Sequence, residues 1–388
     1  MKKKDILLVT NYFPPESGAA SNRMYSMAQG FSENDYNVSV VCPLPNYPQG
    51  KLFDGYKRKL FFKSKESYGT IYRLWIWPNN SSNKFLRLLS MLSFSLSLSL
   101  FFIFLKLPQK VLIQYSPVFV GFTGVFWSRI FRKKIILNVS DLWPIAGLEM
   151  GVLSEGFYFS LLNKMEAFCY QKSHLILGQS KEILEHIHKK EVSPSLFLYR
   201  NYPEFVPQVL NNQPIDGNIQ IIYAGLTGVA QGLFKICASI KLPKHVSLHI
   251  FGTGSEAEQL KLLNKENIYY HGEVKREVLH EKIQEYHLGF VPLSNRIYGS
   301  VPSKIFELSR LGIPVLYFAG GEGENIVIDH QLGWVVPVND IEKLQSFIDS
   351  LTVEKVEVYP SLQVQNNAIN HFDFSTQFQQ LVKKLNNL

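Results

Sequence analysis

The sequence has 388 residues, which is long enough for two domains of ordinary size. Hydrophobic residues make up 46% and charged residues 19%, so the composition excludes a disordered chain. The net charge of +8 predicts a partner with negative charge, such as a nucleotide, a phospholipid surface or a nucleic acid. No nucleic-acid-binding motif occurs, so we predict no nucleic-acid partner.

The first apolar run, "ILLV" within "MKKKDILLVTNYFPP", predicts a buried strand, because it is too short for a signal peptide. The three cysteines, Cys42, Cys169 and Cys237, are far apart and lack the spacing of metal ligands. We therefore expect free thiols and a cytoplasmic location.

Short apolar runs alternate with helical segments along the chain, which is typical of parallel sheets with helices on both faces. The strands predicted in the first half are 5–10, 37–42, 72–77, 110–116, 134–140 and 175–180. Those predicted in the second half are 219–225, 246–252, 268–272, 288–293, 314–318 and 333–337. The predicted fold is α/β, with two doubly wound, Rossmann-like domains facing each other across a cleft.

The predicted domain boundaries follow from composition. Residues 1–200 form the first domain, and residues 201–218, rich in proline and asparagine, form a linker. Residues 219–365 form the second domain. Residues 366–388 are predicted to form a C-terminal helix that can pack back on the first domain.

From Leu88 to Leu105 the chain carries no charge, and this segment is just long enough to cross a membrane. Alternating serines suggest a strand, but the length and the position between two strands favour a crossover helix. Two interpretations stay open: a membrane span, or a crossover helix that can also touch lipid.

The segment 55–65, "GYKRKLFFKSK", interleaves cations with aromatic residues. It is either a solvated loop or a contact with an anionic bilayer surface. In the second interpretation, the cationic side chains are Lys57, Arg58, Lys59, Lys63 and Lys65.

Three glycine-containing loops follow predicted strands. They contain Gly18, the pair Gly225 and Gly228, and the pair Gly252 and Gly254. Each is either an ordinary turn before a helix or a phosphate-binding loop whose backbone amides approach a ligand. None matches a dinucleotide fingerprint or a P-loop.

In "VPSKIFELSRLGIPVLY", Lys304 and Glu307 share one face of a predicted helix because they are three residues apart. Val301, Ile305 and Leu308 have helical spacing on another face and are predicted to be core. The pair is either an exposed ion pair or part of a binding site. No set of His, Cys and carboxylate residues has metal-ligand spacing, so we expect no metal and no cofactor.

The segment "VPSKIFELSRLGIPV" resembles the nucleotide-binding segment of the family 4 retaining glycosyltransferases, which have the GT-B fold. Within that family, the segments beginning at Asn11 and Asn138 resemble the branch that includes N-acetyl-L-fucosamine transferases of bacterial surface-polysaccharide synthesis. The resemblance runs from about Ile6 to about Asp340.

This resemblance implies that the second domain binds a nucleotide-diphosphate sugar. Glu307 would accept hydrogen bonds from the ribose hydroxyls. Lys304 and Ser303 would lie by the diphosphate, where negative charge grows as the nucleotide departs. Gly225 would complete the phosphate cradle, and Val274 would lie in the segment that holds the base.

The sequence departs from the family pattern at three places. Gly299 stands where the family has the first glutamate of its E-x7-E motif, and Ser140 stands where many members have a histidine. The arginine and lysine that many members place after the first strand of the second domain are absent; Leu226 and Thr227 follow Gly225 there. We interpret these departures as variation in sugar recognition.

The remaining candidates each have two interpretations. Glu322 and Glu324 contact hydroxyls of the donor sugar, or they belong to an acidic surface turn. Asp141 orients an acceptor hydroxyl as a catalytic residue, or it caps a helix. Arg23 meets an acceptor phosphate, or it pairs on the surface.

The expected function is transfer of a sugar, with retention, from a nucleotide-diphosphate donor to a polyprenyl-diphosphate-linked glycan in O-antigen or capsule synthesis. We expect peripheral association with an anionic membrane surface on its cytoplasmic face. Two alternatives stay open: a non-catalytic scaffold with the same fold, and a sugar-nucleotide epimerase.

Overall fold

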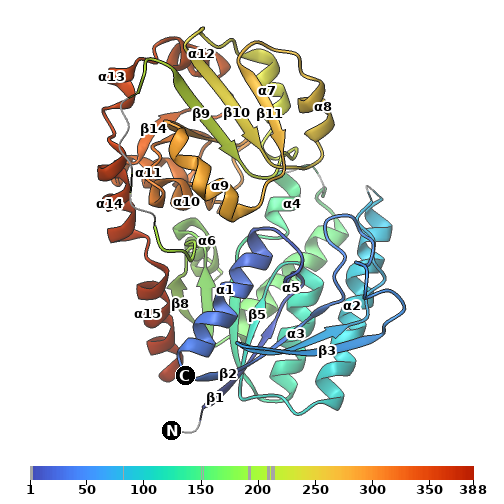
Figure 1. Cartoon of the computed structure of the whole chain (residues 1–388). Helices are drawn as coiled ribbons and strands as arrows, with labels where there is room; N and C mark the ends of the chain where they lie inside the picture. Colours follow the sequence, from blue (N-terminus) through green and yellow to red (C-terminus); the bar gives the residue numbers. More distant parts are fainter. Residues whose placement is uncertain are drawn as a thin grey trace. The chain divides into compact units, whose positions relative to one another are not determined.

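A computed structural model describes residues 3–388 except residues 82, 150, 152, 191–193, 208–209 and 211–214. The chain forms two compact units, the first made of residues 1–201 with 375–388 and the second of residues 202–374 (Figure 1). The first unit ends where the predicted linker 201–218 begins. Residues 208–209 and 211–214 of that linker lie outside the described residues.

The first unit is built on an eight-stranded sheet with the order β3-β4-β2-β1-β5-β6-β7-β8. Only the β3–β4 pair is antiparallel, and all other neighbours are parallel. The strands are β1 (Lys4–Val9), β2 (Tyr36–Pro43), β3 (Phe61–Glu66), β4 (Gly69–Leu74), β5 (Lys110–Gln114), β6 (Lys134–Val139), β7 (Leu175–Gly178) and β8 (Ser195–Leu198). Six strands are present where this half was predicted to have them, although β4 lies three residues earlier than the predicted 72–77, and β3 and β8 were not predicted.

Strand β3 corrects the interpretation of residues 55–65 as a solvated loop for residues 61–65 only, because residues 55–60 form a largely exposed turn. Its residues Phe61 and Lys63 pair with Leu74 and Tyr72 of β4, and Lys63 Nζ lies 5.3 Å from the ring centre of Tyr72. Lysines on an exposed edge strand are common because they discourage pairing with another chain. The segment is therefore a cationic edge strand preceded by a turn.

The helices of the first unit are α1 (Ala19–Glu33), α2 (Lys84–Phe104), α3 (Val118–Ile130), α4 (Ile145–Glu149), α5 (Phe157–Lys172), α6 (Lys181–His188) and α15 (Phe374–Asn386). Helix α2 connects β4 to β5, as expected for a crossover helix, and packs against α3, which packs against α5 (Figure 1). Asn83 caps α2, because its side chain accepts hydrogen bonds from the amides of Phe85 and Leu86. Among the described residues, α2 is the one helix long and apolar enough to cross a membrane.

The second unit is built on a six-stranded parallel sheet with the order β11-β10-β9-β12-β13-β14. All six predicted strands are confirmed: β9 (Ile219–Ala224), β10 (Val246–Phe251), β11 (Ile268–Gly272), β12 (Leu288–Pro292), β13 (Val315–Phe318) and β14 (Gly333–Val336). Alternate residues of β9 enter different core clusters: Ile222 enters one, and Ile221 and Tyr223 enter the other. The sheet is therefore covered on both faces.

The helices of the second unit are α7 (Leu233–Ser239), α8 (Ala257–Leu262), α9 (Arg276–Lys282), α10 (Lys304–Arg310), α11 (Glu322–Asp329), α12 (Ile341–Asp349), α13 (Val353–Val356) and α14 (Ser361–His371). Helix α10 packs against α14 and lies over β12 and β13. This packing places the Lys304 and Glu307 segment on a core element of the second unit.

The single helix predicted over 366–388 is two helices, α14 and α15, with a break at Phe372 and Asp373. The break is held by tertiary contacts: the Phe372 ring lies 4.9 Å from the Phe306 ring, and Arg310 donates to the Phe372 carbonyl at 2.9 Å. Beyond the break, the ring of Phe378 in α15 lies 4.9 Å from that of Phe31 in α1. The break therefore lies where the chain passes from the second unit back to the first.

Candidate functional site

Helix α10 presents Lys304 and Glu307 because its other face is anchored in the core. Ile305, Phe306 and Leu308 are all buried, as is Val301 before the helix, which confirms the predicted core positions. Gly312 follows the helix with φ 79°, a left-handed conformation that glycine adopts without strain. The helix is short and its orientation is fixed at both ends.

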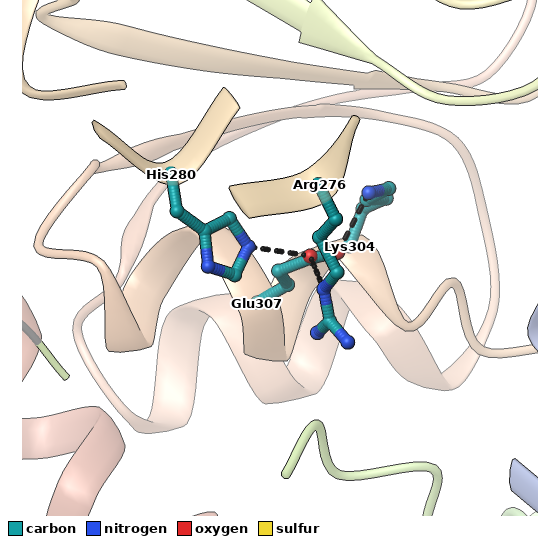
Figure 2. Close-up of polar contacts among 4 residues, drawn as sticks. All are labelled: Arg276, His280, Lys304 and Glu307. Carbon is teal, nitrogen blue, oxygen red and sulfur yellow. Dashed lines mark hydrogen bonds and ion pairs between the residues drawn. The ribbon is translucent and has the colours of Figure 1, made fainter. Parts of the chain in front are cut away.

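The carboxylate of Glu307 is the centre of a four-residue cluster (Figure 2). Its Oε2 lies 2.6 Å from Lys304 Nζ, and its Oε1 accepts hydrogen bonds from Arg276 Nε at 2.9 Å and His280 Nε2 at 3.0 Å. Because an ionised carboxylate only accepts, the Nε2 atom of His280 carries a proton. The exposed-ion-pair interpretation is wrong, since Glu307 is only 8% exposed.

The electrostatics of the cluster favour an ionised Glu307. Burial opposes the charge, yet Lys304, His280 and Arg276 together hold the pKa of this carboxyl well below its ordinary value. The side chains of Lys304 and Arg276 remain 33% and 38% exposed. A buried anion is thus bordered by two cations that are accessible to a ligand.

Arg276 and His280 were not predicted as site residues. They lie four residues apart on α9, so they share a helix face, and that face meets Glu307. Their spacing of four residues, directly after the predicted base-binding residue Val274, is the sequence signal that could have identified them as site candidates. Val274 itself is partly buried against the core of the second unit.

The loops after β9 and β10 lie beside Lys304. A Cβ atom added to Gly225 would come within 3.8 Å of Lys304 Cε, so the structure brings these two predicted site residues together. The amide of Gly225 donates to the Phe251 carbonyl at 3.0 Å, and that of Thr227 donates to the Thr253 carbonyl at 3.0 Å. The predicted amide cradle is therefore corrected: these amides join the two loops to each other.

Glycine is needed where the two loops meet. A Cβ atom on Gly252, which has φ 141°, would lie 1.7 Å from the carbonyl oxygen of Gly225. Gly228 differs, because its amide donates to the side chain of Gln231 at 3.2 Å and its conformation is an ordinary one. Gly252, rather than Gly225, is therefore the glycine that this close loop packing requires, because a Cβ on Gly225 would come no closer than 3.3 Å to its neighbours.

Other predicted donor-side residues lie at helix starts. Ser303 immediately precedes α10, and its carbonyl accepts from the Glu307 amide at 3.1 Å. Glu322 is buried at the start of α11, which corrects its interpretation as part of an acidic surface turn, and Glu324 is partly exposed in the same turn. Gly299, at the position of the family's first glutamate, has φ 82°, so a glutamate there would be strained.

In the first unit, Arg23 is buried, which corrects its interpretation as a surface pair. Its guanidinium donates to Asn138 Oδ1 at 2.7 Å, Gln179 Oε1 at 2.9 Å and the Tyr199 carbonyl at 2.8 Å. Burial lowers the pKa of Arg23 to about 10, so it stays charged at neutral pH. Arg23 thereby joins Asn138 near the end of β6 to the residues that follow β7 and β8.

Asp141 follows β6 and is exposed, and its side chain has no hydrogen bond among the described residues. The neighbouring Ser140 Oγ is buried and has no hydrogen-bond partner in the described part of the chain. Gly18 is partly exposed at the N-terminal end of α1 with φ 130°. Within the described ranges, no three His, Cys, Asp or Glu side chains gather as metal ligands.

Comparisons with known proteins agree with this architecture. Residues 222–352 match the family described as glycosyl transferases group 1. The chain is similar to the structure of sucrose-phosphate synthase from Thermosynechococcus elongatus, with a TM-score of 0.76, 13% identity and 99% of each chain covered. A comparison with curated protein sequences finds no match.

Two further structures have the same fold. One is HepE of Anabaena in complex with UDP-glucose, with a TM-score of 0.66 and 14% identity over 99% of this chain and 100% of that one. The other is WaaG, a glycosyltransferase involved in lipopolysaccharide biosynthesis, with a TM-score of 0.64 and 13% identity over 97% and 98%. The chain therefore has the GT-B fold, and residues 222–352 of its second unit match the group 1 glycosyltransferase family.

Proposed function

We propose that the protein is a family 4 retaining glycosyltransferase whose second unit binds a nucleotide-diphosphate sugar. The observation that carries this proposal is the Glu307 cluster, a buried carboxylate with Lys304 and Arg276 on its accessible side. It lies within the segment that matches the group 1 glycosyltransferases. The relatives whose structures contain UDP or UDP-glucose support a uridine nucleotide as the donor.

In the proposed reaction, Glu307 accepts hydrogen bonds from the ribose hydroxyls with its two carboxylate oxygens. Lys304, beside Gly225, turns toward the diphosphate together with Ser303. When the bond between the sugar and the diphosphate breaks, the electron pair stays on the phosphate oxygen. Lys304 and Arg276 stabilise that charge without a resident metal ion.

The sugar and the acceptor complete the proposal. Val274 lies by the base, and Glu322 and Glu324 contact hydroxyls of an N-acetylated or deoxy sugar. Asp141 orients the acceptor hydroxyl in the first unit. The acceptor is a polyprenyl-diphosphate-linked glycan of O-antigen or capsule synthesis, as in the N-acetyl-L-fucosamine transferase branch.

A lipid-linked acceptor requires that the protein meet a membrane. We propose peripheral association on the cytoplasmic face, through the cationic residues of 57–65 and the apolar helix α2. Lys59 Nζ lies 4.3 Å from the ring centre of Phe62, so this cation already covers an aromatic ring at an exposed edge. If the segment 55–65 is only solvated, replacing these cations should leave vesicle binding unchanged.

The test is a thermal-shift and calorimetric comparison of UDP, GDP and their sugar conjugates, because a ligand that binds only the native state raises its melting temperature. We expect one nucleotide to raise the melting temperature of the wild type and to lose this effect in Glu307→Ala. If no nucleoside diphosphate binds, the proposed function is wrong.

A non-catalytic scaffold is the second candidate, favoured by the conformation of Gly299 and by Ser140 at the usual histidine position. This candidate predicts nucleotide binding without donor hydrolysis or transfer. Slow hydrolysis of the bound sugar nucleotide, abolished in Lys304→Ala, would exclude it.

A further inference from the structure

A shallow basic pocket lies in the first unit, at the end of its sheet opposite to the carboxyl ends of the parallel strands. It is lined by Arg129, Ile130, Arg132, Lys133, Lys134 and His174. These residues come from the end of α3, the turn that follows it, the start of β6 and the residue before β7. The Glu307 cluster belongs to the second unit, so this pocket is a separate site.

The pocket has positive charge and no acidic lining residue. Lys133 donates to the Leu107 carbonyl at 3.0 Å. The side chains of Arg129, Arg132 and Lys134 have no hydrogen bond or ion pair with any residue that the structure describes. Like charges are costly to gather without a counter-ion, so the arrangement favours an anionic ligand. Phosphate is the anion that such arginine and lysine sets recognise.

An apolar face adjoins this pocket along helix α2. Six of its large apolar residues are between 36% and 64% exposed and follow helical spacing: Phe85, Leu89, Leu92, Leu96, Leu100 and Ile103. The opposite side of α2 is buried, at Phe94, Leu98 and Phe102. The helix is therefore held in the first unit by one face and exposes an apolar row on the other.

The apolar face continues over the two neighbouring helices. Exposed apolar residues of the α3 end are Phe126, Ile130 and Phe131, and those of α5 are Phe157, Tyr158 and Leu161. Helix α2 packs against α3 and α3 against α5, so these exposed apolar residues lie on three neighbouring helices. Exposed apolar residues gathered on neighbouring elements favour an interaction site, unlike single residues scattered over the molecule.

The serines of α2 fit an apolar environment. The hydroxyls of Ser93, Ser97 and Ser99 donate to the carbonyls of Ser90, Ser93 and Ser95 of the same helix. A hydroxyl that is satisfied within its own helix loses little when water is replaced by hydrocarbon.

The pocket and the apolar face meet at the C-terminal ends of α2 and α3. Ile130 belongs to both, since it lines the pocket and is 50% exposed. Lys133 binds the carbonyl of Leu107, close in sequence to Phe104, which ends α2 and is 78% exposed. A surface with cations at the rim of an apolar patch complements an anionic bilayer.

We propose that the face formed by α2, α3 and α5 lies on the membrane and that the basic pocket holds the phosphate of an anionic lipid headgroup. This inference rests on the proposed function only in placing the protein at a membrane. It makes α2 an in-plane helix, because a spanning helix would have to withdraw Phe94 and Leu98 from the core of the first unit.

The test is co-sedimentation with phosphatidylcholine vesicles that contain or lack phosphatidylglycerol. The pocket variant is Arg129→Gln/Lys134→Gln. The matched control, Lys383→Gln/Lys384→Gln, removes the same charge from exposed positions on α15, which packs on α1.

We expect the pocket variant to bind phosphatidylglycerol vesicles about 30-fold more weakly, from about 1 kcal/mol for each cation near the surface. The control should lose much less. Equal losses of vesicle affinity in both variants would mean that only net charge matters, and would overturn the assignment of this pocket as a headgroup site.

A second variant, Leu96→Ser/Leu100→Ser, tests the apolar face without removing charge. We expect it to release the protein from vesicles, whereas unchanged binding would overturn the membrane face. Resistance of wild-type binding to alkaline carbonate would show a span instead. A last comparison adds millimolar inorganic phosphate, at an ionic strength well below that of the high-salt wash. If phosphate then releases the wild type from the vesicles as completely as high salt does, the pocket binds free phosphate rather than a lipid headgroup.

Nucleotide calorimetry on the same variants separates this inference from the proposed function. The substitutions lie in the first unit and the proposed nucleotide site in the second, so nucleotide affinity should not change. An unchanged melting temperature shows that each variant is folded. A wild type that binds vesicles but no nucleotide would overturn the proposed function alone. One that binds nucleotide but no vesicle would overturn this inference and the membrane association proposed above, but not the nucleotide-sugar site of the second unit.

Discussion

Lys304 Nζ lies 2.6 Å from Glu307 Oε2, and the two side chains come from adjacent turns of α10. The same carboxylate is held from α9 by Arg276 and His280. Two short helices are therefore tied together by one buried anion, whose replacement should affect both ligand binding and stability.

Replacing Glu307 with alanine should weaken nucleoside-diphosphate affinity by about 1.5–3 kcal/mol, the range for hydrogen bonds to a charged group. Isothermal calorimetry with UDP measures the change. Glu277→Ala is the matched control, because Glu277 is exposed on α9 and is not among the described residues that pair with Arg276, His280 or Lys304. An unchanged affinity in Glu307→Ala would remove Glu307 from the donor site.

The ion pairs of Glu307 should make stability depend on pH. Its pKa in the folded protein is held well below the ordinary value of 4.5, so the ionised form stabilises the fold. This contribution is complete above pH 4.5 and decreases as the pH falls toward the folded-state pKa. Denaturant unfolding of the wild type and Glu307→Gln should show a difference that is constant near neutral pH and shrinks in acid. A difference that grows in acid would contradict this assignment.

Replacing Lys304 with alanine should reduce turnover more than donor affinity, because charge on the leaving diphosphate is greatest in the transition state. The expected loss of turnover is roughly 10²–10³-fold, as for removal of one preorganised stabilising group. Steady-state kinetics and donor calorimetry together give the comparison, with Lys282→Ala on α9 as the control. Equal losses in turnover and affinity would show that Lys304 contributes only ground-state attraction.

Replacing Gly252 with alanine should destabilise the second unit by about 3–5 kcal/mol, since the added Cβ meets the Gly225 carbonyl in a left-handed conformation. The displaced loop should also weaken nucleotide binding, because Gly225 lies beside Lys304. Gly228→Ala is the control, since its added Cβ meets the end of the Gln231 side chain at 3.1 Å. Similar melting temperatures for both variants would show that the two loops can separate at little cost.

The sequence predicted the two sheets well because strand signals are local. All twelve predicted strands are present, since each is a short run of apolar residues that a parallel sheet buries. Strand β3 was missed because its lysines and aromatic residues also suit an exposed loop. Its pairing with β4 follows from contacts between strands rather than from its own composition.

The candidate site was predicted only where its residues are close in sequence. Lys304 and Glu307 were found from their spacing on one helix, whereas Arg276 and His280 reach Glu307 across 31 and 27 residues. The burial of Arg23 was missed for the same reason, because its partners lie more than 100 residues away.

The path of the chain gives the second unit the character of an inserted module. It is one continuous segment, and near its two ends the rings of Tyr202 and Phe372 lie 5.5 Å apart. The first unit is instead assembled from two segments, because α15 returns to it and packs Phe378 against Phe31. A chain cut before residue 375 would keep every strand of both sheets yet lose part of the first unit's core. To exchange the second unit between relatives, the chain should therefore be joined at both residue 201 and residue 375 rather than at one of them.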